Sequence, residues 1–267
     1  MKKRGSSLPG NRHAIGRDML YRYSGCPLER FGKYILLTNF SVYMQRFTEE
    51  RQAQLYEGSV LRVAVDRAAG VTMIHFNIGA PSAALVIDLL SAVTPKAVIM
   101  LGLCGGLHRS LSVGEFILPI AAVRNEGVSQ HYMPKDVPSL PTFKVQDIIA
   151  HTLKEKAVPF KTGVVHSTDY RFWEFDAAFK KRLREEQVIA IEMECAAIFT
   201  VAFCMKVPVG ALLLVSDLPL TSRGIKTYAL QQKVFKKHLR EHLILGIEAL
   251  QTIKKMGTKI DLRHYEW

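Results

Sequence analysis

Fully apolar runs of about five residues recur along this chain and alternate with longer stretches of helical periodicity. Residues 97–101 and 211–215 contain only apolar side chains, which is typical of strands covered on both faces of a sheet. Further strands are predicted at residues 34–38, 60–65, 71–76, 116–120, 121–124 and 160–165. Helices are predicted at residues 79–93, 145–156, 176–186 and 227–255. This alternation favours an α/β fold with a mixed, largely buried sheet.

The two ends of the chain differ in character from the middle. Residues 1–27 are polar and basic with scattered Gly and Pro, so we expect a loose basic N-terminal arm. One domain is expected over residues 28–255, followed by a polar C-terminal tail over residues 256–267. The basic N-terminus lacks an apolar segment after it, which favours a cytoplasmic protein without a signal peptide.

A long apolar stretch at residues 196–215 has the length of a membrane span. Lys206, Pro208 and Gly210 interrupt it in the middle, which is typical of a helix followed by a strand. We therefore expect no membrane partner.

The formal net charge of +12 is high for 267 residues, and much of it lies in clusters near the two ends. Solvated tails and one helix face are the favoured interpretation, and attraction of anionic substrates or of nucleic acid is the alternative. We do not expect nucleic acid as a partner. The four cysteines show neither a CxxC pair nor metal-ligand spacing, so no metal and no cofactor are predicted.

Residues 190–220 carry the acidic groups of greatest interest. Glu192 and Glu194 flank Met193 just before a helix of small apolar residues, and Ser216 and Asp217 end the strand that follows. Residues two apart do not share a helix face, so at most one glutamate should point into a given pocket. Two carboxylates in different environments can act differently, one ionised and one protonated. Helix caps and solvated surface groups are the alternative interpretation.

The Glu192-Met193-Glu194 triplet and the Ser216-Asp217 pair resemble the signature of the nucleoside phosphorylase/nucleosidase superfamily. Within it, the chain is most similar to short-form AMP nucleosidases, on segments that include PLERFGKYILLTNF (27–40), the 80–107 segment ending in MLGLCGGL, ILPIAAVRNEG (117–127), VPSLPTF (137–143), GALLLVSDLPL (210–220) and GIKT (224–227). The resemblance implies a single-domain αβα sandwich, with a mixed sheet curled towards a barrel. It also implies a homo-hexamer built from dimers.

The resemblance implies hydrolysis of AMP to adenine and ribose 5-phosphate. Asp217 would protonate the purine at N7, which requires a pKa raised by burial, and Glu194 would stay ionised and hold the ribose hydroxyls. Met193 would pack on the ribose, beside Ser216. Gly105 belongs to a glycine turn that allows close backbone approach to a ligand.

Two departures from the family pattern bear on the reaction. Phosphorylases place an Arg and a Ser or Thr where this chain has Met100 and Leu103, which favours water over phosphate as nucleophile. AMP nucleosidases have two consecutive arginines where this chain has Tyr170 and Arg171.

Arg171 is therefore the first candidate for the 5′-phosphate, because a guanidinium binds phosphate bidentately. The weaker cationic candidates are Lys226 and Arg124, with Arg46 and Arg109 as possible contributions from a neighbouring subunit. The base would stack on Phe172 or Tyr170.

The group that activates water is not identified, and Glu126 is the weakest of the candidates. Alternative functions are a purine nucleoside phosphorylase, a nucleosidase that acts on adenosine-type nucleosides without 5′-phosphate, or a nucleotide-binding module without turnover.

Overall fold

The computed structural model describes residues 9–221, 224–225 and 227–257. A mixed sheet runs through it in the order β2-β3-β4-β1-β5-β8-β7-β6-β9, and β9 pairs with β5 as well as with β6. This second pairing closes β5, β8, β7, β6 and β9 into a barrel, in agreement with the curled sheet that the resemblance implies. The strands are β1 (Tyr34–Thr38), β2 (Gln54–Glu57), β3 (Arg62–Asp66), β4 (Val71–His75), β5 (Ala97–Gly106), β6 (Phe116–Asn125), β7 (Phe160–Thr168), β8 (Ala190–Glu192) and β9 (Val209–Asp217).

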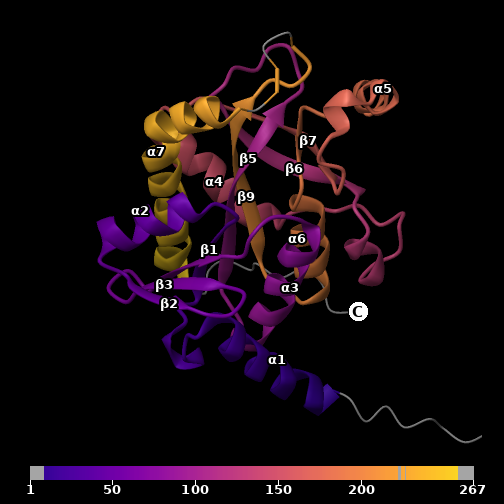
Figure 1. Ribbon diagram of the computed structural model, residues 1–267. Helices are drawn as coiled ribbons and strands as arrows, with labels where there is room; N and C mark the ends of the chain where they lie inside the picture. The colour runs from indigo at the N-terminus through magenta and orange to yellow at the C-terminus, as the bar shows by residue number, and fades with distance from the viewer. Residues whose placement is uncertain (1–8, 222–223, 226, 258–267) are drawn as a thin grey trace, which may run out of the picture.

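Helices cover both faces of the sheet, which gives the predicted three-layer αβα arrangement (Figure 1). One core cluster lies between the sheet and α3 and α6, and the other lies between the sheet and α2, α4 and α7. The helices are α1 (Pro9–Ser24), α2 (Ser41–Arg51), α3 (Ala80–Leu90), α4 (Phe143–Glu155), α5 (Ala177–Glu185), α6 (Cys195–Cys204) and α7 (Tyr228–Met256). None of the helices in the described part of the chain has the length and apolar content of a bilayer span.

The central strands are buried because helices cover them on both sides. All nine residues of β9 are buried, and β5 pairs in parallel with it from Val98 to Cys104. Neighbouring parallel strands end at one edge of the sheet, where an open α/β sheet binds its ligands. The apolar run therefore positions Ser216 and Asp217 at that edge.

A buried histidine ties α7 to the sheet and to α2. His242 is fully buried, its Nε2 lies 2.9 Å from the Leu212 carbonyl oxygen, and its Nδ1 lies 2.7 Å from the Tyr43 hydroxyl. These partners fix the tautomer: Nε2–H donates to the carbonyl, and the Tyr43 hydroxyl donates to Nδ1. Burial lowers the pKa of His242 to about 3, so the ring is neutral at physiological pH.

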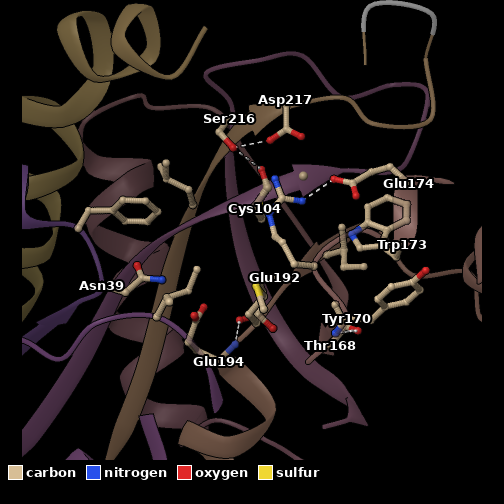
Figure 2. Close-up of a pocket in the computed structure, with 17 residues that line it drawn as sticks. Asn39, Cys104, Thr168, Tyr170, Trp173, Glu174, Glu192, Glu194, Ser216 and Asp217 are labelled. Atoms are coloured by element: carbon tan, nitrogen blue, oxygen red, sulfur yellow. Dashed lines mark hydrogen bonds and ion pairs between the residues drawn. The ribbon is translucent and has the colours of Figure 1, made fainter. Parts of the chain in front are cut away.

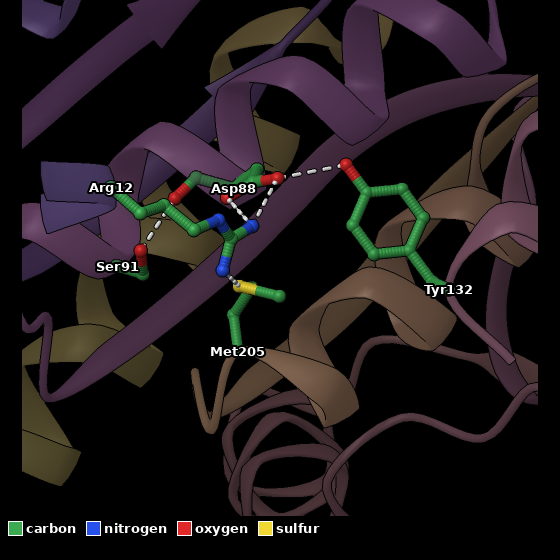
Figure 3. A network of polar contacts seen from close by, with 5 residues as sticks. All are labelled: Arg12, Asp88, Ser91, Tyr132 and Met205. Carbon is green, nitrogen blue, oxygen red and sulfur yellow. Dashed lines mark hydrogen bonds and ion pairs between the residues drawn. The ribbon is translucent and has the colours of Figure 1, made fainter. Parts of the chain in front are cut away.

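Residues 9–24 form a helix, so the prediction of a loose arm over residues 1–27 is wrong for this part. Leu20 is fully buried in the main core cluster. Arg12 binds both carboxylate oxygens of Asp88 on α3, at 2.8 and 2.9 Å, and the Tyr132 hydroxyl donates to the same carboxylate at 2.8 Å (Figure 3). Tertiary packing thus orders a segment that its sequence alone does not mark as helical.

We predict that α1 contributes to global stability through Leu20 far more than through Arg12. Leu20→Ala should lower the free energy of unfolding by about 2–5 kcal/mol, because it removes a fully buried side chain. Arg12→Ala should cost about 0–1 kcal/mol, because its side chain is 61% exposed. Urea unfolding of both variants measures this. Equal, near-zero effects would mean that α1 does not fold with the domain.

Candidate active site

A pocket lies at the edge of the sheet where β1, β5, β7, β8 and β9 end (Figure 2). It contains the two acids proposed from the sequence, Asp217 and Glu194. Figure 2 shows Asp217 at one end of the pocket and Glu194 at the other, with Cys104 between them. The single unit of β8, α6 and β9 therefore brings together two carboxylates that are 23 positions apart in the chain.

Glu192 is the residue that connects β8 to α6. Its Oε2 accepts hydrogen bonds from the backbone N–H groups of Glu194 and Cys195, both at 2.7 Å. Its Oε1 accepts a hydrogen bond from the Ser167 hydroxyl on β7. Burial raises the pKa of Glu192, and these donors oppose the rise. Its carboxylate satisfies the open N–H groups at the start of α6, so Glu192 has a structural role.

Glu194 turns away from Glu192 and faces the pocket. Its Oε1 accepts a hydrogen bond from the Gly79 backbone N–H at 2.8 Å, and the Asn39 side chain is a second hydrogen-bond partner. Gly79 has φ +100°, a conformation that favours glycine, so the segment that delivers this N–H depends on it. Burial raises the pKa of Glu194 to about 7, and the neighbouring Glu192 adds to the rise.

Asp217 ends the apolar strand β9 and is 5% exposed. Its Oδ1 lies 2.5 Å from the Ser216 hydroxyl oxygen, which is also 3.2 Å from the Cys104 carbonyl oxygen. Gly105 lines the same pocket, and a Cβ there would lie 3.1 Å from the Pro219 ring. Asp217, Ser216 and Gly105, three candidates from the sequence, therefore line the same pocket.

The segment after β7 forms a third wall of the pocket. Tyr170 and Arg171 line it, as predicted, together with Trp173 and Glu174, which sequence reasoning missed. Arg171 Nη1 lies 2.7 Å from Glu174 Oε1, and Glu174 Oε2 is buried without a hydrogen-bond partner. The guanidinium charge of Arg171 is thus already paired with a carboxylate.

Three predicted substrate contacts are not found in the pocket. Arg124 donates hydrogen bonds to the carbonyl oxygens of Met133, Pro134 and Val137 at 2.6–2.8 Å, so it holds the 133–137 loop, and it lies outside the pocket lining. Phe172 is 67% exposed and lies outside the pocket lining. Lys226 lies outside the described residues.

The residues considered for phosphate binding and for water activation do not all line the pocket. Leu103 and Met193 line the pocket, whereas Met100 is fully buried in the core and does not. Glu126 accepts a hydrogen bond from the Ser129 backbone N–H at 3.0 Å and lies outside the pocket lining. Among the described residues no group of His, Cys, Asp or Glu is arranged to hold a metal ion.

Comparison with known protein families matches residues 33–248 to the model of the phosphorylase superfamily. The chain belongs to this superfamily. Its match covers every strand of the sheet and the residues at both ends of the pocket, Glu194 and Asp217.

Relatives within the phosphorylase superfamily include enzymes of both nucleosidase and phosphorylase type. The AMP nucleosidase of Escherichia coli K12 is 26% identical over 91% of this chain, which spans only 60% of that protein's length. The crystal structure of AMP nucleosidase from Bacteroides thetaiotaomicron is 40% identical, with a TM-score of 0.81 over 91% of this chain and 98% of that one. Uridine phosphorylase from Vibrio fischeri, at 24% identity over 84% of this chain and 94% of that one, with a TM-score of 0.75, shows the same fold.

We predict that the buried charge of Glu194 destabilises the fold above neutral pH. Its pKa is raised from an ordinary value near 4.5 to about 7, so its favourable contribution is complete below pH 4.5 and is lost as the pH rises through 7. Glu194→Gln should therefore gain stability relative to the parent between pH 5 and pH 8, by up to about 3 kcal/mol. Thermal unfolding across this range measures it.

The matched control is Glu185→Gln on α5, because the Glu185 side chain is 64% exposed. This variant should show no comparable trend with pH. A stability difference for Glu194→Gln that stays flat from pH 5 to pH 8 would contradict the raised pKa.

Proposed function

We propose that this chain hydrolyses the N-glycosidic bond of AMP and releases adenine and ribose 5-phosphate. The observation that carries the proposal is the pair of buried carboxylates, Asp217 and Glu194, at opposite ends of one pocket. Two relatives that match most of the chain, one of them at 40% identity, are named AMP nucleosidases. Together these observations favour a nucleotide whose base lies at one acid and whose sugar lies at the other.

Asp217 is proposed as the general acid. Cleavage of the N-glycosidic bond passes through a state resembling an oxocarbenium ion, and an adenine anion is a poor leaving group. A proton transferred from Asp217 to N7 lets the base leave as neutral adenine. A general acid in this position typically contributes about 10²–10⁴ in rate, or roughly 3–5 kcal/mol. The Ser216 hydroxyl holds the Asp217 carboxyl in place by its hydrogen bond to Oδ1.

Glu194 is proposed to bind the 2′- and 3′-hydroxyls of the ribose. Both hydroxyls are donors, and the Glu194 carboxylate, held by the Gly79 N–H and by Asn39, is a strong acceptor for them once it ionises as the pH rises through about 7. Its negative charge also stabilises the positive charge that develops on the sugar in the transition state. Met193 lines the pocket beside Glu194 and would pack against the ribose.

Water is proposed as the nucleophile. Leu103, which lines the pocket at the position where phosphorylases are expected to hold phosphate, cannot bind an oxyanion. We also propose the homo-hexamer implied by the resemblance and the cytoplasmic location favoured by the N-terminal sequence. Neither is needed for the chemistry at Asp217 and Glu194.

Asp217→Asn is expected to remove nearly all base release from AMP, because the amide cannot deliver a proton to N7. Chromatography of free adenine over time measures this, and a circular dichroism spectrum checks the fold. Asp147→Asn on α4 is the matched control, because Asp147 does not line the pocket, and it should keep parental activity. Turnover within a few-fold of the parent in Asp217→Asn would exclude Asp217 as the general acid.

Base release from AMP is expected to require no inorganic phosphate. The sugar product should be ribose 5-phosphate, because water attacks C1′. Mass spectrometry of the products distinguishes it from a 1-phosphorylated sugar. Strict dependence on added phosphate, with ribose 1,5-bisphosphate as product, would identify a phosphorylase instead.

A further inference from the structure

A second cavity adjoins the pocket and shares Asn39 and Phe40 with it. The pocket itself measures about 110 Å³, well below the ~300–1,000 Å³ that small-molecule sites usually occupy. The second cavity is larger, at about 520 Å³. A whole nucleotide in the pocket therefore needs room beyond it, and the second cavity offers that room on the side of Asn39.

The charge of a nucleotide decides which part of it suits this cavity. In a β-nucleotide the base at C1′ and the 5′ carbon at C4′ lie on the same face of the ribose, on either side of the ring oxygen, and the 2′- and 3′-hydroxyls lie on the opposite edge. Figure 2 shows Asp217 and Glu174 at one side of the pocket and Asn39 and Glu194 at the other. The phosphate is the anionic group of a nucleotide whose base lies at Asp217 and whose ribose hydroxyls lie at Glu194, so an anion site that adjoins the pocket at Asn39 is the place for it.

The second cavity has the chemistry of an anion site. Its lining includes the side chains of Arg62 and His75 and the hydroxyls of Ser41 and Ser59, and it contains no acidic residue among the described ones. Ser41 is the first residue of α2, whose N-cap, Phe40, makes no side-chain cap hydrogen bond. The positive end of this helix thus faces the same cavity as the two basic side chains.

Arg62 is available to a ligand, although it has a partner on the surface. Its Nε lies 3.4 Å from Glu57 Oε1, and the two side chains are 51% and 64% exposed. An exposed ion pair of this kind contributes little free energy, so a phosphate can replace Glu57 as the partner of the guanidinium at small cost. His75, whose pKa is lowered by burial and by Arg62, is neutral at physiological pH, and its single N–H is hydrogen-bonded to the backbone of Asn39. The positive charge of the cavity therefore comes from Arg62 and from the start of α2.

Arg171 is a poorer phosphate ligand than the sequence suggested. Its guanidinium is 2.7 Å from Glu174, a residue with 8% exposure that Figure 2 shows on the side of Asp217. A phosphate bound there would meet the Glu174 carboxylate, and the repulsion between like charges would offset the contact with Arg171. The surroundings of Arg171 suit the base end of the ligand.

We propose that the cavity lined by Arg62, His75 and Ser41 binds the 5′-phosphate of the nucleotide. This inference rests on the proposed function for the placement of base and ribose. It assigns the discrimination between nucleotide and nucleoside to the β3–β4 hairpin and the start of α2. Arg171 then contributes to binding of AMP and of adenosine alike.

The test measures binding rather than turnover, so that it does not depend on catalysis. Titration calorimetry with AMP and with adenosine is carried out on the Asp217→Asn protein and on the same protein with Arg62→Ala, Arg67→Ala or Arg171→Ala. Arg67 is the matched control, because it lies just after β3, is bonded to Gln54 and does not line the cavity.

Arg62→Ala should weaken AMP binding by roughly 10- to 150-fold, which corresponds to the loss of a charge-assisted hydrogen bond, and should leave adenosine binding unchanged. Arg67→Ala should change neither, and Arg171→Ala should weaken both ligands to a similar extent. Inorganic phosphate should compete with AMP when Arg62 is present and should not when it is replaced.

Several results would overturn the inference. Equal effects of Arg62→Ala on AMP and adenosine, or no effect on either, would exclude this cavity as the phosphate site. A loss of affinity for AMP but not for adenosine in Arg171→Ala would identify Arg171 as the phosphate ligand. Failure of the proposed function is recognised separately, because it would leave AMP binding intact in a protein that releases no base in its parental form.

Discussion

The carboxylate of Glu192 accepts three hydrogen bonds in the buried junction between β7, β8 and α6, and the geometry of the pocket depends on them. Two come from the first N–H groups of α6 and one from the Ser167 hydroxyl. Without an acceptor at this position, the start of α6 would bury unpaired donors at considerable cost. Because the turn between β8 and α6 is fixed in this way, the next acid, Glu194, is directed into the pocket.

The pocket therefore combines two buried acids whose burial has a cost for the fold. Glu194 has a pKa raised to about 7, and Asp217 ends a strand that is buried throughout. Apolar strands and helices on both sides of the sheet supply the stability that offsets this cost, since the two core clusters extend along its whole length. The fold thus holds Glu194 in surroundings that raise its pKa, and it buries Asp217 in the same pocket.

The sequence predicted the elements whose pattern is set locally and missed those set by tertiary contacts. The apolar runs in β5 and β9 and the long periodicity of α7 were recognised, and with them the positions of Asp217 and Glu194. Residues 9–24 were missed because Gly, Arg and Asn obscure a helix that Leu20 and the Arg12–Asp88 pair hold in place. Arg124 was misassigned because nothing in the sequence indicates that its guanidinium binds loop carbonyls. Glu174 was missed because it lies in an aperiodic segment.

The most direct test of this account is a crystal structure of the Asp217→Asn protein with AMP bound. The account predicts that N7 of adenine lies within hydrogen-bond distance of the side chain at position 217, and that the ribose 2′- and 3′-hydroxyls bind the Glu194 carboxylate. The bond to be cleaved then lies between the two acids. A nucleotide bound in the reverse direction, with its ribose at position 217 and its base at Glu194, would contradict the assignment of both residues.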